Sequence, residues 1–417
     1  MQIHPETGYL IVLEKDHQSK SIQMIEQEKQ RIYEETKDQE FFETEWADLG
    51  GYPKSAKDTF ASCIRIVDPQ TMQTLSVLPF PERETCFSIY VSQGPMGQAY
   101  LSGAEHGESY LFCGVGLNAT LSPRGCSLGF IKTYKFSNRG KSLELVHSTP
   151  CEDIPNTFNE CSGRLITGVG NILRVYELGQ KKLLRKQENK NFISPIFNIQ
   201  VTEGGRVFAS DLSESIHCLK YKPDEAQLYI FADDILKRWT TSFCMLDPDT
   251  AVGVDKFENL FVNRLPPGCE DDAEDDPTAT KFKWENGCLN GAAFKMDSIN
   301  QFFLGEMGTK VIKCQLNPHS GSELVLVATT MGSLQAFVPF ETREDVDFFT
   351  HLEMYLRIES QPLCGRDHVT FRSIYVPVKD VIDGDLCQMY SNLDFNKQRV
   401  LADELDRTPP EVMKKLE

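Results

Sequence analysis

A thiol, a carboxylic acid and an imidazole stand close together in one short stretch of this sequence. Cys364-Gly365-Arg366-Asp367-His368 contains the residue types of a cysteine nucleophile with its base and an orienting acid. A nucleophile must, however, meet its base in space, and adjacent residues on a strand point to opposite faces. The stretch therefore indicates a structural turn, and we expect no catalytic residue and no enzymatic activity.

Metal-ligating residue types occur only in incomplete sets. His351-Leu352-Glu353 and His217-Cys218 each offer fewer ligands than a zinc site needs. Asp383-Gly384-Asp385 lacks the rest of an EF-hand loop, and capping of a helix start explains both acids. The sequence contains neither a phosphate-binding loop nor a dinucleotide fingerprint. We expect neither a metal nor an organic cofactor.

The composition favours a protein that binds other proteins. The 417 residues carry a formal net charge of −18, whereas binding to nucleic acid depends on neutralising phosphates with Lys and Arg. Thirteen cysteines stand at irregular spacing, which indicates reduced thiols in the cytosol or nucleus. Since no apolar run approaches the length of a membrane span, we expect no contact with membranes.

A short pattern repeats along the chain and predicts the elements that carry these residues. An apolar run rises into a small-residue or Asp/Thr turn, and a second apolar run follows, as in GRLITGVGNILRVYELG from Gly163. The copies that include Arg164, Arg206 and Thr250 are spaced by 42 and 44 residues. A strand repeat of about 40–45 residues is typical of β-propeller blades, which must pack radially to bury both faces. The sequence therefore predicts an all-β, WD40-like propeller without the WD signature.

Beyond Phe340 the spacing of apolar residues changes from that of strands to that of helices. Thr342 begins a capping pattern, and a later helix starts at Thr408-Pro409-Pro410-Glu411. The stretch 369–378 is predicted to be a strand that pairs with the strand at 9–14 and closes the ring. The predicted division is a propeller over 1–340 with a charged insertion at 18–60 and an acidic loop at 267–287, a helix plus ring-closing strand over 341–378, and a small C-terminal α-helical domain over 379–417.

Several longer stretches resemble one protein family. FADDILKRWTT from Phe231, LLRKQENK from Leu183 and the tail from Leu363, with LCGRDH, VIDGDL and ELDRTPPEVMKKLE, are similar to the splicing factor 3b subunit 3 family. That family is related to damaged-DNA-binding protein 1 and to the large polyadenylation-factor subunit. The resemblance implies three seven-bladed propellers and a C-terminal helical domain. This sequence would supply the third seven-bladed propeller and the helical domain.

Two positions depart from the family's pattern. Glu258 stands in the turn Lys256-Phe257-Glu258-Asn259 where the family usually has Gly, and Gln187 stands where Cys is common. We expect neither change to disturb the fold.

Five basic residues form the one positive cluster of the sequence. They permit two interpretations: a solvated blade edge, on which lysines discourage strand pairing, or a contact with an acidic partner or RNA. The absence of aromatic residues among these charges disfavours RNA. The cluster consists of Lys181, Lys182, Arg185, Lys186 and Lys190.

Propellers bind most often through loops on one rim. If 229–245 holds two strands, Ile235 to Trp239 form the loop between them, and Asp255 to Phe257 form a turn of the following repeat. Arg238 and Trp239 are the favoured anchors because Trp and Arg dominate interface energetics; the alternative is that Trp239 only fills space between blades. The predicted partner-binding residues are Ile235, Lys237, Arg238, Trp239, Asp255 and Lys256, with Ser122, Arg124, Ser194 and Lys379 as additions.

The resemblance implies a non-enzymatic scaffold of the splicing factor 3b complex in the U2 small nuclear ribonucleoprotein. Its expected partners are the HEAT-repeat subunit and small subunits, with indirect association to small nuclear RNA and pre-mRNA, in the nucleus. The expected role is pre-mRNA splicing and branch-site recognition. One alternative is a ubiquitin-ligase adaptor like damaged-DNA-binding protein 1. A propeller hydrolase is the other, and it would need converging acids or a metal at the central channel.

Overall fold

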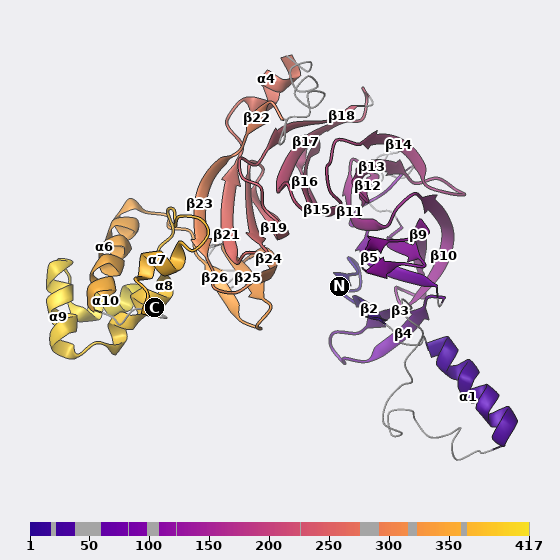
Figure 1. Cartoon of the computed structure of the whole chain (residues 1–417), viewed down its shortest axis with the longest axis horizontal. Helices are drawn as coiled ribbons and strands as arrows, with labels where there is room; N and C mark the ends of the chain where they lie inside the picture. Colours follow the sequence, from indigo (N-terminus) through magenta and orange to yellow (C-terminus); the bar gives the residue numbers. More distant parts are fainter. Residues whose placement is uncertain are drawn as a thin grey trace. The chain divides into compact units, whose positions relative to one another are not determined.

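The chain divides into two compact units, Met1–Phe231 and Ala232–Glu417, in the computed structural model. Figure 1 shows sheets in both units and a group of helices near the C-terminus. The structure describes residues 1–17, 22–37, 60–81, 83–97, 108–121, 123–225, 227–275, 292–315, 323–359 and 365–416.

The described part of the first unit holds four sheets in which strands close in sequence lie side by side. Two further short strands, β7 (Thr120–Leu121) and β8 (Arg124–Gly125), form a separate ribbon. The four sheets, each in spatial order, are β1 (Gln2–Ile3), β2 (Leu10–His17), β3 (Phe60–Val67) and β4 (Thr74–Pro79); β10 (Ser142–Cys151), β9 (Leu128–Ser137), β6 (Tyr110–Leu117) and β5 (Glu84–Val91); β11 (Pro155–Cys161), β12 (Arg164–Val169), β13 (Ile172–Glu177) and β14 (Leu184–Asn189); and β15 (Ile196–Thr202), β16 (Arg206–Asp211), β17 (Ile216–Lys222) and β18 (Gln227–Asp233).

Alternate residues of β6 enter two different hydrophobic cores. Leu111 and Val115 pack in a cluster with Ile64 of β3, whereas Phe112 packs in a second cluster with Leu165 of β12. Because successive side chains of a strand point to opposite faces, the sheet of β6 has a core on each side. This packing explains why its central strand is an almost uninterrupted apolar run, and it is the packing of propeller blades.

The second unit continues the same architecture. Val252 and Leu260 of one sheet share a hydrophobic cluster with Val311 and Val327 of the next. Strand β22 (Phe294–Lys295) pairs in parallel with the end of β18. The sheets of the described part are β19 (Thr240–Asp247), β20 (Thr250–Asp255), β21 (Asn259–Arg264) and β23 (Asp297–Phe303), followed by the three-stranded β24 (Gly308–Cys314), β25 (Leu324–Thr329) and β26 (Leu334–Phe337).

The Asp/Thr turns of the sequence repeat hold the hairpins together. Asp211, Asp255 and Thr329 each end the second strand of a sheet. In each case a side-chain oxygen accepts hydrogen bonds from main-chain N–H groups two to four residues ahead, at 2.6 to 3.2 Å. The side chains replace bonds that a tight turn cannot make within its own main chain.

Six blade-like sheets are formed by the described residues of the chain. The predicted all-β propeller with C-terminal helices is confirmed. Seven blades, which the resemblance implied, are not confirmed, because no seventh sheet of this kind occurs among the described residues.

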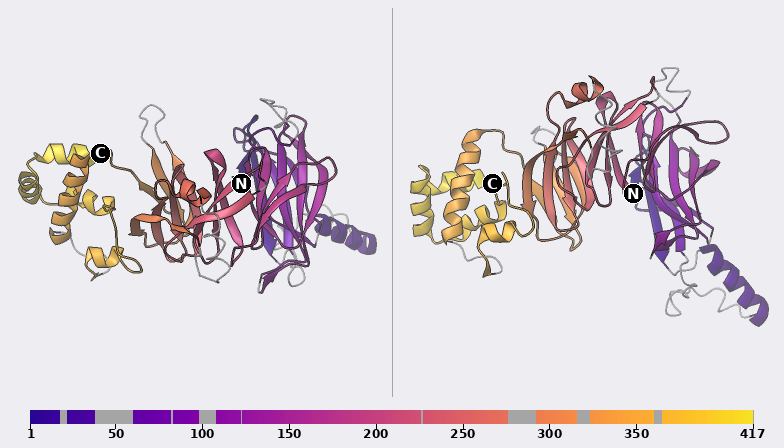
Figure 2. Two further views of the ribbon diagram at one scale, coloured as in Figure 1. Left: turned by 90° about the horizontal axis from the view of Figure 1, so that it is seen from above. Right: turned by 45° about the horizontal axis from the view of Figure 1, so that its top comes forward.

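Figure 2 shows the helices after Phe340 grouped together in the second unit, and all of them except His368–Arg372 contribute to one apolar core. Phe348, Leu352 and Leu356 lie on one face of the first of these helices and pack against Tyr390 and Val412. Within the described ranges, no helix is long and apolar enough to cross a membrane. The helices are α6 (Arg343–Glu359), α7 (His368–Arg372), α8 (Gly384–Gln388), the 3-10 turn η3 (Met389–Asn392), α9 (Phe395–Glu404) and α10 (Pro409–Leu416).

Predicted capping residues begin these helices. Thr342 Oγ1 accepts from the N–H of Asp345 at 3.1 Å, and the Glu411 carboxylate accepts from the N–H of Thr408 at 2.7 Å. Asp383 is the N-cap of α8, which confirms the helix-cap interpretation of its carboxylate.

The predicted ring-closing strand over 369–378 is wrong. Asp367 accepts from the N–H groups of Val369 and Thr370, so this segment starts as helix α7 instead of a strand. The residue after this segment, Lys379, forms an isolated antiparallel bridge with Gln301 of β23. In the first unit β2 pairs with β1 and β3, not with the segment predicted to close the ring.

Both charged insertions contain helix where they are described. Helix α1 (Ile22–Thr36) lies in the predicted insertion at 18–60, of which 18–21 and 38–59 lie outside the described residues. Helix α4 (Cys269–Asp275) opens the acidic stretch and carries three acids in its first turn. Negative charge near a helix N-terminus is favourable, which accounts for a helix in such an acidic segment.

Candidate partner-binding surface

Five large apolar or aromatic side chains are exposed together at the ends of strands in the second unit. Ile235, Leu236 and Trp239 lie in the loop between β18 and β19, Phe257 lies in the turn between β20 and β21, and Tyr375 follows α7. Their exposed fractions are 59%, 39%, 38%, 48% and 60%. We call these residues the rim patch. A grouping of exposed apolar side chains is typical of a protein-binding site.

Arg238 lies beneath the rim patch instead of on it. Only 4% of its surface is exposed, its Nε donates to Asp234 Oδ2 at 3.2 Å, and its guanidinium carbon lies 4.4 Å from the centre of the Phe261 ring. Asp234 also accepts from the N–H of Leu236 at 3.0 Å. The prediction that Arg238 is an anchor touching a partner does not fit this burial. The ion pair spans four residues of chain and positions the loop from inside.

Asp255 is likewise an internal residue. It is 3% exposed, and its carboxylate accepts from the N–H groups of Phe257 and Asn259 and from the Asn259 amide. Burial raises the pKa of Asp255 above its ordinary value, and the donated hydrogen bonds oppose that shift. Asp255 therefore holds the turn that exposes Phe257, and its burial does not fit the prediction that it contacts a partner.

Glu258 has the left-handed backbone conformation in this turn, with φ of 67°. Glycine adopts that conformation without the steric cost that a side chain carries. The glycine that the resemblance implies for this position would avoid that cost, whereas Glu258 adopts the conformation at some cost in strain.

Lys256 joins the two loops of the rim patch. Its Nζ lies 3.9 Å from the centre of the Trp239 ring, and its main-chain N–H donates to the Trp239 carbonyl at 2.9 Å. Trp239 therefore keeps part of its surface exposed while one face carries a cation. This arrangement does not fit the alternative in which Trp239 only fills space between blades. Lys237 is exposed in the same loop.

Tyr375 reaches the rim patch from the helical segment. Its ring centre lies 5.5 Å from that of Phe257 and 6.1 Å from that of Phe303. Arg372 fixes the segment to the sheet, since its Nη1 donates to the Phe303 carbonyl at 3.0 Å and its Nε to Asp383 at 2.6 Å. The sequence prediction missed Tyr375 because it assigned this segment to a strand.

The remaining predicted partner-binding residues are not part of the rim patch. Ser194 Oγ accepts from the N–H of Ser213 at 3.1 Å, so it supports a turn in the first unit. Arg124 belongs to β8 of the same unit. Lys379 bonds to the main chain of β23 in the second unit. Ser122 lies outside the described residues.

Three of the five cations in the predicted basic cluster pair with acids of their own sheet. Lys186 pairs with Glu177 at 2.7 Å, whereas Arg185 and Lys190 pair with Glu188 at 3.2 Å and 2.9 Å. These ion pairs favour the interpretation of a solvated blade edge over an RNA contact. Lys181 and Lys182, the other two cations of the cluster, form no ion pair with the described residues.

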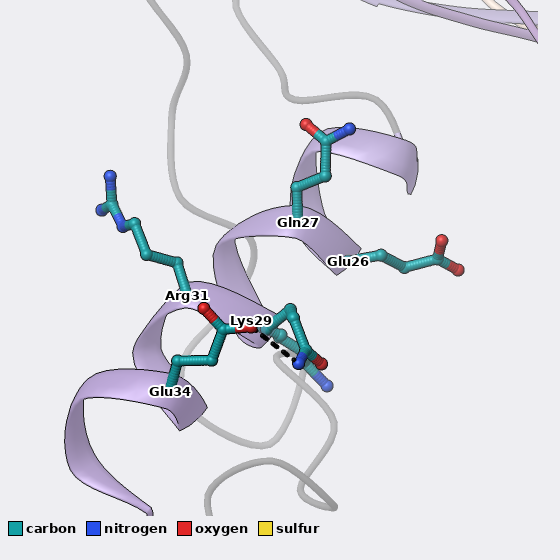
Figure 3. Close-up of a pocket in the computed structure, with 6 residues that line it drawn as sticks. Glu26, Gln27, Lys29, Arg31 and Glu34 are labelled. Atoms are coloured by element: carbon teal, nitrogen blue, oxygen red, sulfur yellow. Dashed lines mark hydrogen bonds between the residues drawn. The ribbon is translucent and has the colours of Figure 1, made fainter.

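Among the described residues with catalytic side chains, His368 lies against two acids: its Nε2 is 3.2 Å from Asp383 Oδ2 and 3.6 Å from Glu353 Oε1. Of the stretch Cys364 to His368, the thiol lies outside the described residues. Among the residues that the structure describes, no group of three or more His, Cys, Asp or Glu side chains could hold a metal ion. Figure 3 shows a shallow hollow along α1, where Gln30 donates to Glu34 at 3.1 Å. Its lining comes from one polar helix face: Glu26, Gln27, Lys29, Gln30, Arg31 and Glu34.

Comparison with known proteins agrees with the resemblance in the sequence. Splicing factor 3B subunit 3 of Danio rerio is 42% identical over 430 residues, which cover 100% of this chain and 34% of that protein. Spliceosome-associated protein 130 A of Arabidopsis thaliana is 46% identical over 368 residues, which cover 88% of this chain and 30% of that protein. Splicing factor 3B subunit 3 of Drosophila melanogaster is 40% identical over 430 residues, with coverage of 100% and 34%.

The chain spans about a third of the length of the curated relatives it matches. A family model described as the CPSF A subunit region matches residues 61–392, from strand β3 to the end of η3. The matched region includes the rim patch and every strand of the blade-like sheets except β1 and β2. The chain therefore belongs to the family of the CPSF A subunit region.

Proposed function

We propose that this chain is a non-enzymatic protein-binding scaffold that acts in pre-mRNA splicing. The observation that carries the proposal is 40–46% identity to proteins named as splicing factor 3B subunit 3 and spliceosome-associated protein 130. The rim patch supplies the means, because it presents exposed aromatic side chains on loops that buried groups hold in place. Binding to such a surface forms and breaks no covalent bond.

We take the location, the complex and the partners of the chain from its family. The chain would work in the nucleus, within the splicing factor 3b complex of the U2 small nuclear ribonucleoprotein. There it would hold the HEAT-repeat subunit and smaller subunits that take part in branch-site recognition. Association with small nuclear RNA and pre-mRNA would be indirect, as the net charge of −18 favours.

The finer architecture is also a proposal. A seven-bladed propeller over 1–340 would be followed by helical segments over 341–378 and 379–417. One common apolar cluster of α6, α8, α9 and α10 supports a helical domain that begins near Arg343. The six described sheets support the propeller, and a crystal or electron cryo-microscopy structure would count its blades.

Affinity purification of the tagged chain from nuclear extract of its own source tests the function. Mass spectrometry should identify the HEAT-repeat subunit and other splicing factor 3b components among the bound proteins. Recovery of a cullin in their place would support the ubiquitin-ligase adaptor instead. Extract passed over an unrelated tagged propeller of similar charge serves as the control.

A further inference from the structure

Two cations lie against one aromatic ring in the first unit. Lys15 Nζ is 4.7 Å and the Arg124 guanidinium carbon 5.6 Å from the centre of the Phe87 ring. The same guanidinium carbon lies 4.6 Å from the centre of the Phe197 ring, and Arg124 Nη2 donates to Asn156 Oδ1 at 2.6 Å. These five residues, which we call the aromatic cation site, fix the guanidinium between two rings.

The packing of successive sheets creates this site. Phe87, Asn156 and Phe197 come from β5, β11 and β15, each of which is the edge strand of its own sheet. Lys15 comes from β2 of a fourth sheet, and Arg124 comes from the short β8. No sequence motif joins these positions, so only the arrangement of neighbouring blades brings them together.

The two cations lack a counter-ion in the described part of the chain. Neither Lys15 nor Arg124 forms an ion pair there: Glu14 is paired with Arg65, and Asp153 favours the charged form of Arg124 only from a distance. Both side chains nevertheless keep exposed surface that a ligand can reach.

The surroundings of Lys15 and Arg124 disfavour the charged forms of both side chains. Partial removal from water lowers the pKa of Lys15, and the charge of Arg124 lowers it further. Partial removal from water also lowers the pKa of Arg124. Two like charges are thus held together where water solvates them less well, and a bound anion would stabilise both.

We propose that the aromatic cation site binds a carboxylate side chain from an acidic segment of a partner protein. The Arg124 guanidinium, which lies against the Phe87 and Phe197 rings, is a planar fork that matches the planar carboxylate, and Lys15 adds a second cation. A site of two cations suits one carboxylate better than a nucleic acid, whose binding rests on neutralising several phosphates. This proposal does not depend on a role in splicing.

The test uses the full chain and a short fluorescein-labelled peptide of alternating Glu and Gly, with fluorescence anisotropy as the measurement. The site variant is Lys15→Gln with Arg124→Gln. The matched control is Lys141→Gln with Lys414→Gln, which removes the same charge from two exposed lysines elsewhere on the chain. The site variant should bind the peptide about tenfold more weakly than the unmodified chain, because charge-assisted hydrogen bonds are lost. The control should bind unchanged.

A second variant separates geometry from charge. Arg124→Lys keeps the charge but loses the planar fork, so it should also weaken peptide binding severalfold. Lys15→Gln alone changes one exposed side chain and covers the case in which the double variant unfolds. Failure of the unmodified chain to bind the peptide, or an equal loss in the control, would overturn the proposal. Tighter binding of a short oligouridylate than of the peptide would also overturn it, in favour of a phosphate site.

Discussion

The Nζ of Lys256 lies 3.9 Å from the centre of the Trp239 ring, while the main-chain N–H of Lys256 donates to the Trp239 carbonyl at 2.9 Å. The connection between β18 and β19 and the turn between β20 and β21 are therefore joined through both side chain and main chain. The buried groups Arg238 and Asp255 support them from below. Such a surface is organised before a partner arrives, which lowers the entropy lost on binding.

Arg238→Met should destabilise the protein by about 3 kcal/mol, because it removes an ion partner of the buried Asp234 carboxylate and the charge-assisted hydrogen bond between them. Urea unfolding measures the change. The control is Lys237→Met, which alters the exposed neighbouring side chain. If Arg238→Met lowers the free energy of unfolding no more than the control does, the buried ion pair does not hold the loop.

Glu258→Gly should stabilise the protein by roughly 0.5–1 kcal/mol. The left-handed conformation costs a residue with a side chain about 1–2 kcal/mol, and the greater freedom of glycine in the unfolded chain offsets part of the gain. Thermal unfolding should show a rise in Tm of roughly 1–3 °C. Glu258→Ala removes the charge but keeps the strain, so it should show no rise. A lower Tm for Glu258→Gly would contradict the argument from strain.

Asp255 should make stability depend on pH in a specific direction. Burial raises the pKa of its carboxyl above the ordinary 3.8, so the folded state binds the proton more readily than the unfolded state. The contribution of Asp255 to stability therefore falls as pH rises from the unfolded pKa through the raised folded pKa. The amide introduced by Asp255→Asn cannot ionise, so that variant lacks this dependence.

The free energy of unfolding of Asp255→Asn minus that of the unmodified protein should thus increase through this pH window and level off above it. Urea unfolding at a series of pH values gives both quantities under matched conditions. A difference that decreases with rising pH would mean that the donated hydrogen bonds outweigh burial.

Cys387 should resist alkylation in the folded protein. Burial, followed by the charges of Glu353 and Asp383, raises the pKa of its thiol to about 12. Since the thiolate is the reactive form, iodoacetamide at about pH 8 should label this position only after unfolding in urea. Peptide mass spectrometry measures the labelled fraction. Rapid labelling of Cys387 without urea would show that the helical core opens readily.

The parts of the fold that depend on nearby residues could be predicted from the sequence. The apolar repeats predicted the hairpins, and the Asp/Thr turns between them contain the side chains that bond the turn main chain. Thr342, Asp383 and the Thr408–Glu411 pair predicted helix starts, because a cap acts within about one turn.

The parts that depend on distant residues could not be predicted. Arg238 has the residue type of an interface anchor, but its burial follows from Phe261 on another hairpin. Arg185 and Lys190 have the types of a basic patch, yet both pair with the Glu188 carboxylate. Residues 369–378 have the composition of a strand, whereas the Asp367 cap and the contacts of Arg372 with β23 favour a helix.

The most direct test of the scaffold account is calorimetric titration of this chain with the purified HEAT-repeat subunit of splicing factor 3b from the same source. Trp239→Ala with Phe257→Ala should weaken binding at least about a hundredfold, since aromatic anchors each contribute about 2 kcal/mol or more. The control is Met331→Ala with Leu334→Ala, two side chains that are 80% and 74% exposed outside the rim patch, and it should bind as the unmodified chain does. Unchanged affinity for the Trp239 and Phe257 variant, or an equal loss in the control, would contradict a role for the rim patch in partner binding.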